Sequence, residues 1–120
     1  MLKLIDNNLI KSAHDVSLGG IITAVSKMCI KGKKGINIKK PKFLINEIEY
    51  LFAEDQGRYI IEINKKDFKK VADILNKNAV HFDELGTISE NELYINDKTK
   101  VTIDELSTSN KSWLTNYMSK

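Results

Sequence analysis

The chain has 120 residues, of which 42% are apolar and 29% are charged, and this is the size and balance of one globular domain with its own core, or of a fragment of something larger. Its single cysteine excludes a disulfide scaffold and a cysteine-based zinc cluster within the chain. No apolar run is long enough to span a bilayer and the first residues lack the features of a signal peptide, so we expect a cytoplasmic protein without a membrane segment.

The net charge of +3 conceals an uneven distribution along the chain. Residues 1–42 carry 9 lysines and 2 acidic residues, whereas residues 43–120 carry 10 basic and 14 acidic residues. Arg58 is the only arginine among the 19 basic residues. Because lysine cannot replace a planar guanidinium that binds two acceptors, this one arginine is informative.

In the first half of the chain, hydrophobic periodicity predicts the end of a helix within 2–9, a helix over 19–31, a strand over 35–38 and a short helix over 46–51. Ser17 is the expected N-cap of the 19–31 helix, and Gly32 is its expected stop. The lysine-rich stretch 31–43, which contains the single proline Pro41, is predicted to be a long loop within one domain.

In the second half, the pattern predicts a strand over 58–63, a helix over 65–77, strands over 81–89 and 92–96, and a final helix that ends near 118. Asn64 is the expected N-cap of the 65–77 helix, and Thr102 with Glu105 forms a capping-box pattern. The final helix is expected to bury its apolar side chains, which are Ile103, Leu106, Trp113, Leu114 and Tyr117. Alternating helices and strands predict an α/β or α+β fold with helices packed on a sheet.

One segment that departs from ordinary patterns spans residues 12–20. His14 and Asp15 lead into the glycine pair Gly19 and Gly20 at a predicted helix start. Glycines allow a ligand to approach the backbone closely, and a helix N-terminus attracts anions, so one interpretation is a ligand site. The other is a strand-to-helix turn in which Asp15 and Ser17 cap the helix and the glycines permit tight packing.

The second such segment is a strand entrance that holds two acids, an amide, a glycine and the only arginine. Gln56 and Arg58 could bind a carboxylate, an amide or a phosphate, and Glu54 with Asp55 could bind a metal or a sugar hydroxyl. The alternative is a turn around Gly57 that is closed by an internal ion pair of Arg58 with one of the two acids.

The remaining candidates point to structure more than to chemistry. Cys29 lies on a helix with an apolar face and is expected to be a buried, inert thiol, and His81 is expected to begin a strand with a structural role. The chain has no GxxxxGK[ST] loop and no His-x-x-x-His pair, so we expect no metal site. The basic block from Lys27 to Lys42 is either a solvated surface or a polyanion-binding or RNA-binding surface, and the absence of interleaved aromatic residues favours the former.

Together, the two unusual segments resemble the C-terminal domain of phosphoribosylformylglycinamidine synthase, the ATP-dependent amidine synthase of purine biosynthesis. The resemblance covers nearly the whole chain and lies in residues 12–20 with the following helix, residues 52–59, and the closing segments 85–88, 93–95 and 104–118. The family usually has an aspartate where Leu18 stands. The resemblance implies a layered α/β/α domain of the AIR-synthase C-terminal type, partly ferredoxin-like, that spans 1–120 as part of a larger multidomain enzyme.

The family enzyme converts formylglycinamide ribonucleotide, glutamine or ammonia, and ATP to formylglycinamidine ribonucleotide. Its ATP, magnesium and catalytic groups lie mainly in domains that this chain lacks. The resemblance therefore implies that this domain has no catalytic residue, binds no cofactor of its own and is inactive alone.

The implied partners are the N-terminal A-type and B-type domains of the same synthase and a glutaminase subunit, and a homodimer of the isolated domain is possible. Nucleic acid is kept only as the alternative partner of the basic block. The residues that the resemblance assigns to a substrate or nucleotide site or to a domain interface are His14, Asp15, Ser17, Gly19, Gly20, Glu54, Asp55, Gln56, Gly57 and Arg58.

Overall fold

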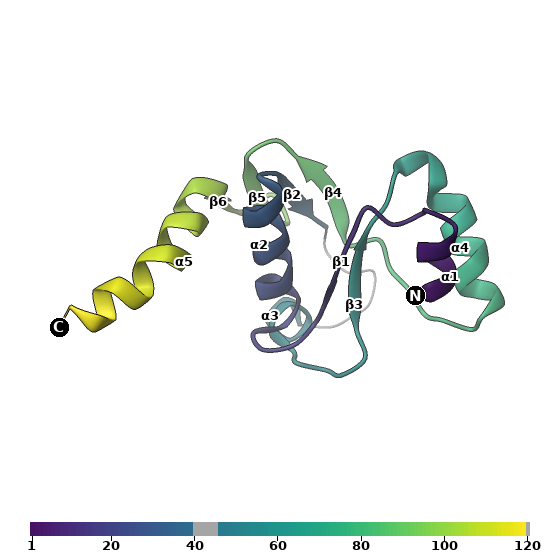
Figure 1. Cartoon of the computed structure of the whole chain (residues 1–120), viewed down its shortest axis with the longest axis horizontal. Helices are drawn as coiled ribbons and strands as arrows, with labels where there is room; N and C mark the ends of the chain where they lie inside the picture. Colours follow the sequence, from purple (N-terminus) through teal and green to yellow (C-terminus); the bar gives the residue numbers. More distant parts are fainter. Residues whose placement is uncertain (40–45, 120) are drawn as a thin grey trace.

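The computed structural model describes residues 1–39 and 46–119, which form a mixed α/β fold, as expected from the sequence (Figure 1). The elements are α1 (Leu2–Asp6), β1 (Ser12–Asp15), α2 (Gly20–Gly32), β2 (Gly35–Ile38), α3 (Glu47–Phe52), β3 (Tyr59–Glu62), the 3-10 turn η1 (Lys65–Asp67), α4 (Phe68–Lys77), β4 (Gly86–Ser89), β5 (Glu92–Ile95), β6 (Thr99–Thr102) and α5 (Ile103–Met118). Pro41 and the end of the basic block lie outside the described residues.

The strands form two sheets. Strands β1 and β3 make an antiparallel ribbon, and the other four form a sheet in the order β4-β2-β5-β6. Within that sheet β2 and β5 are parallel, and the other neighbouring pairs are antiparallel. In Figure 1 the ribbon stands in the middle of the molecule, with α2 and α3 on one side and α1 and α4 on the other.

Each face of the ribbon packs against a different hydrophobic core. Ile60 of β3 contacts the larger core, whereas Ile61 and Ile63 contact the smaller one, because successive side chains of a strand point to opposite faces. The buried residues of the larger core are Val16, Ile21, Val25, Cys29, Ile38, Leu51, Leu93 and Ile103. Those of the smaller core are Leu4, Leu9 and Val71. The ribbon is therefore held from both sides, which fixes the position of its ends.

Helix α2 lies where the sequence predicts it, but its ends differ from the prediction. The N-cap is Gly19, with a φ of 82°, and not Ser17, so the prediction of Ser17 as the cap is wrong. At the other end, Gly32 is the last helical residue and Lys33 adopts the left-handed conformation, with a φ of 51°. The predicted stop at Gly32 is therefore displaced by one residue.

The second half of the chain contains three corrections. Asn64 is the N-cap residue of the 3-10 turn η1 and not of an α-helix, and its side chain makes no capping bond but donates from its amide to Asp67 Oδ2 at 3.1 Å. The predicted strand 81–89 is shortened to β4, so His81 lies before the strand, with its Nε2 3.3 Å from Asp83 Oδ2. Strand β6 was not predicted, because a four-residue segment of threonine, lysine and valine gives little hydrophobic contrast.

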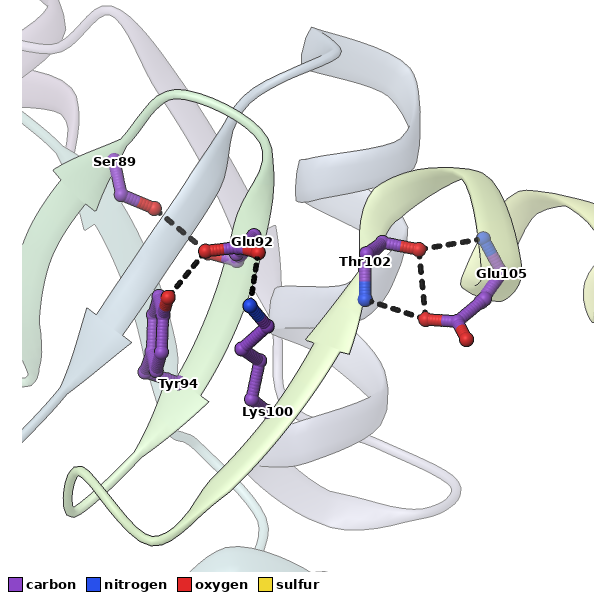
Figure 2. Close-up of polar contacts among 6 residues, drawn as sticks. All are labelled: Ser89, Glu92, Tyr94, Lys100, Thr102 and Glu105. Atoms are coloured by element: carbon purple, nitrogen blue, oxygen red, sulfur yellow. Dashed lines mark hydrogen bonds and ion pairs between the residues drawn. The ribbon is translucent and has the colours of Figure 1, made fainter.

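Helix α5 begins as predicted but buries only the first of the residues predicted. The capping box is confirmed, because Thr102 Oγ1 accepts from Glu105 N at 3.2 Å and Glu105 Oε2 accepts from Thr102 N at 2.9 Å (Figure 2). Ile103 is buried, but Trp113, Leu114 and Tyr117 are mostly exposed. In Figure 1 the helix extends away from the rest of the molecule, so its second half has little of the domain beneath it. No helix among the described residues is long and apolar enough to cross a membrane.

Candidate functional site

The ribbon brings the two unusual segments of the sequence together. In β1 and β3, Asp15 lies opposite Tyr59, and just beyond this pair Val16 N donates to Arg58 O at 2.9 Å. Residues 17–20, here called the glycine turn, therefore lie beside residues 54–58, here called the acidic segment. The sequence predicted both segments as site candidates, and the structure makes them one continuous surface.

A carboxylate of the acidic segment occupies the N-terminus of α2. Gly19 N donates to Glu54 Oε1 at 2.7 Å. The first N–H groups of a helix lack partners within the helix, and its dipole favours a negative charge there, so Glu54 meets both requirements. The sequence predicted that this helix start attracts an anion, and in the structure the chain itself provides the anion.

The second glycine of the turn is required by close packing on α3. Gly20 has a φ of 69°, and a Cβ atom at this position would lie 2.6 Å from Leu51 O and 2.7 Å from Phe52 Cα. The interpretation that the glycines permit tight packing is therefore confirmed for Gly20. By contrast, Gly57 has a φ of 78° and a Cβ atom there would have nothing within 4 Å, so this glycine serves only the backbone conformation of the turn.

The only arginine makes two bonds within the domain. Arg58 Nη1 donates to Asp55 Oδ2 at 2.7 Å, and Nη2 donates to Tyr50 O, in α3, at 3.4 Å. Of the two internal ion pairs considered from the sequence, the one with Asp55 forms, and the Glu54 carboxylate instead binds the glycine turn. The guanidinium thus ties the acidic segment to α3 through two directed donors, which a lysine cannot reproduce.

The remaining polar candidates are exposed or form local contacts. His14 Nδ1 lies 2.6 Å from Asp15 O and 3.5 Å from Asp15 Oδ1, and Ser17 and Gln56 are exposed. Residues 1–39 and 46–119 contain no group of three or more His, Cys, Asp or Glu side chains that could hold a metal ion. The described part of the chain therefore offers no cluster of ligands for a magnesium ion.

Large apolar side chains surround the glycine turn and the acidic segment, and the sequence did not predict them as part of a site. Leu18 is 80% exposed within the turn itself, and Ile48, Phe52 and Tyr59 are also exposed. Ile48 and Phe52 lie one helical turn apart on α3, and Tyr59 directly follows Arg58. Apolar and aromatic residues mixed with hydrogen-bonding groups are typical of protein–protein interfaces. Hydrophobic periodicity could not separate these residues from core residues.

A second polar cluster, on β5 and β6, was also not predicted (Figure 2). Lys100 Nζ lies 2.6 Å from Glu92 Oε1, and the Tyr94 hydroxyl donates to the other carboxylate oxygen of Glu92. Lys100 thereby lowers the pKa of Glu92, and Glu92 raises the pKa values of Tyr94 and Lys100. Ser89 Oγ donates to the Glu92 carbonyl at 2.7 Å. The charges satisfy one another across the hairpin, which is the arrangement of a structural cross-strand pair.

Two other predictions concern lysines and the cysteine. Cys29 is buried as expected, and burial raises its pKa to about 11, which keeps the thiol protonated and unreactive. In the basic block, Lys39 Nζ pairs with Glu84 Oε1 at 2.6 Å, and Lys27 lies on α2. Part of the positive charge of the basic block is thus neutralised by an acidic residue of the same domain.

The fold and this surface define a mixed α/β domain in which a glycine turn is capped by an acidic segment that connects α3 to β3. Residues 1–98 match the family model described as AIR synthase related protein, C-terminal domain, and the chain belongs to this family. The family resemblance and the fold class expected from the sequence are thus confirmed.

Curated relatives carry the name phosphoribosylformylglycinamidine synthase subunit PurL. One from Pelagibacter ubique is 66% identical over 118 residues, which cover 98% of this chain and 16% of that protein. One from Bartonella henselae is 35% identical over 115 residues, which cover 96% of this chain and 16% of that protein. The chain thus spans about one-sixth of the length of these relatives.

Solved structures agree on the fold. Thermotoga maritima PurL complexed with FGAR matches with a TM-score of 0.75 and 22% identity, covering 88% of this chain and 19% of that one. The structure of PurLQS from the same organism matches with a TM-score of 0.77 and 21% identity, covering 88% and 20% of the two chains.

Proposed function

We propose that residues 1–120 form one domain of a phosphoribosylformylglycinamidine synthase, the ligase that converts formylglycinamide ribonucleotide to formylglycinamidine ribonucleotide with ATP and with nitrogen from glutamine or ammonia. The observation that carries the proposal is the 66% identity to a PurL subunit over 98% of this chain. Structures of Thermotoga maritima PurL complexed with FGAR, ATP and AMPPCP support this substrate and the use of ATP in the whole enzyme.

Within that enzyme, the domain has a positioning role and is inactive alone. The polar groups of its candidate site are already bonded within the domain: Glu54 binds the glycine turn, and Asp55 and Arg58 bind each other. The exposed apolar residues beside them, Leu18 and Phe52 among them, form a surface suited to a neighbouring domain. ATP and magnesium would then be held by the parts of the synthase outside this chain.

The partners in this proposal are the A-type and B-type domains of the same synthase and a glutaminase subunit that supplies ammonia, in the cytoplasm. The glycine turn and the acidic segment are the proposed contact surface for the neighbouring domain. The alternative role in binding RNA or another polyanion has no support from the comparisons, and the Lys39–Glu84 pair removes part of the charge that it would need.

A segment exchange tests the proposal. The matched segment of the Pelagibacter ubique PurL subunit is replaced by this chain, and ATP-dependent formation of the amidine is measured with the subunit's partners present. We expect the exchanged enzyme to be active and the 120-residue chain alone to be inactive. If the exchanged enzyme is stable and folded but forms no amidine, while the unmodified relative does form it, the proposal is wrong.

A further inference from the structure

One face of α5 packs against the larger core at the start of the helix, and the same face carries exposed apolar side chains in the second half of the helix. Ile103 is buried in the larger core and Leu106 packs against that core. The same helical face continues through Asn110 to Trp113 and Tyr117, which follow Ile103 at the spacing of three and four residues that aligns side chains along a helix. Trp113 and Tyr117 are each 66% exposed, and their rings stack at 5.8 Å.

A groove lies where α5 leaves α2. It has a volume of about 290 Å³, and its lining combines three apolar residues with five polar ones, which are Ile22, Ile30 and Leu106 and Thr23, Ser26, Lys27, Ser109 and Asn110. Its α5 side leads along the helix towards Trp113. The groove and the two stacked rings therefore form one surface, here called the α5 surface, with an apolar floor at one end and aromatic side chains at the other.

The second half of α5 is polar but almost uncharged. Between residues 106 and 118 the only charged residue is Lys111, and the other polar residues are serine, threonine and asparagine apart from Tyr117. Leu114 and Met118, next to the stacked rings, are also exposed. Tryptophan, tyrosine and methionine with few charges are the residues that protein interfaces favour at their centres.

The relative from Pelagibacter ubique has both this helix and further chain that could cover it. The family model ends at residue 98, before α5 begins, whereas the match to the Pelagibacter ubique PurL subunit covers 98% of the chain and so reaches into this helix. That subunit has most of its length outside the match, because the match covers only 16% of it. The helix is thus shared with a synthase that has a large body of further chain available to pack against it.

We propose that the α5 surface is a docking site for the remainder of the synthase polypeptide, which covers Trp113 and Tyr117 and fills the groove beside α2. This inference rests on the proposed function. It names a second contact surface, separate from the glycine turn, through which the domain is held in the enzyme.

Hydrogen–deuterium exchange tests the docking. It compares the 120-residue chain with the Pelagibacter ubique subunit that carries this chain in place of its matched segment. We expect amides of α5 near Trp113 to exchange at least about tenfold more slowly in the exchanged subunit, because docking suppresses local opening of the helix. The double variant Trp113→Ser with Tyr117→Ser should lose this protection, whereas the matched variant Ile88→Ser, at another exposed apolar residue, should retain it.

In the isolated chain, the double variant should unfold at the wild-type temperature, because both side chains are mostly exposed there. If the α5 amides exchange equally fast in the isolated chain and in the exchanged subunit, and that subunit still forms the amidine, the docking is overturned while the proposed function stands. If the exchanged subunit with the wild-type segment folds but forms no amidine, both the docking and the proposed function are overturned. Protection of α5 in the isolated chain that rises with protein concentration overturns the docking in favour of a second copy as the occupant.

Discussion

The packing of Gly20 on α3 yields the sharpest prediction, because the structure offers matched control positions. In Gly20→Ala, the new Cβ would meet backbone atoms, Leu51 O at 2.6 Å and Phe52 Cα at 2.7 Å, at a φ of 69°. In Gly57→Ala, the φ is 78° but nothing lies within 4 Å of the new atom. The two variants therefore share the conformational cost and differ in the packing cost.

The magnitudes follow from these two terms. A left-handed alanine costs about 1–2 kcal/mol, and displacing well-packed neighbours costs a further 1–3 kcal/mol or so. Gly20→Ala should then lower the free energy of unfolding by about 2–5 kcal/mol, a large part of the stability of a domain of this size. Gly57→Ala should lower it by about 1–2 kcal/mol, and the smaller entropy of the unfolded alanine chain offsets part of this in both variants.

Urea denaturation followed by circular dichroism measures both values. Gly19→Ala should fall between them. Its Cβ would lie 2.2 Å from Thr23 Oγ1, which can rotate away, and 2.9 Å from Thr23 Cβ, which cannot, whereas at Gly20 the close neighbours are all backbone atoms. If Gly20→Ala lies within about 0.5 kcal/mol of Gly57→Ala, which is the scatter of ordinary surface substitutions, then α3 does not abut the glycine turn and the reasoning fails.

Three further changes test the site and the core. Glu54→Ala should destabilise the domain by about 1 kcal/mol, as loss of a helix cap does, and Glu54→Gln, which keeps an acceptor for Gly19 N, should cost less in the same urea titration. Arg58→Lys should fold, but its free energy of unfolding should be about 0.5–1 kcal/mol lower because its pair with Asp55 is weakened. A melting temperature equal to that of the wild type would contradict this. Burial raises the pKa of Cys29 from 9.0 to about 11, so its contribution to stability is complete below pH 9 and disappears as the pH rises through about 11; Cys29→Ala should lack this alkaline loss in denaturation measured from pH 8 to 11.

Elements whose signals are local were predictable from the sequence. Helix α3 begins after Asn46, whose side chain accepts from Ile48 N, and α5 begins with the capping box at Thr102. Both depend on hydrogen bonds between residues two or three positions apart, so the residue types and their spacing suffice. The helix face that buries Val25 and Cys29 was likewise visible as a spacing of apolar residues.

Features that depend on distant segments were not predictable in this way. Ser17 has the residue type of an N-cap, yet Glu54, 35 positions after Gly19, provides the negative charge at that helix start. Sequence periodicity also predicts that Trp113 and Tyr117 are buried, but it cannot say that the described domain leaves both side chains mostly exposed. Periodicity reports which face of a helix is apolar, and only tertiary structure reports what covers it.

The same distinction clarifies the role of the glycine turn and the acidic segment. Gly19 N and the charged groups of Glu54 and Arg58 are all bonded inside the domain, so they have little left to offer another molecule without breaking a bond. Beside these groups, the apolar side chains of Leu18 and Phe52 are exposed. Leu18 is 80% exposed, so a domain that packs on this turn meets a hydrocarbon side chain. The affinity of a contact here should therefore depend on burial of apolar area and change little with salt concentration. The single arginine acts by holding the acidic segment in place within the domain.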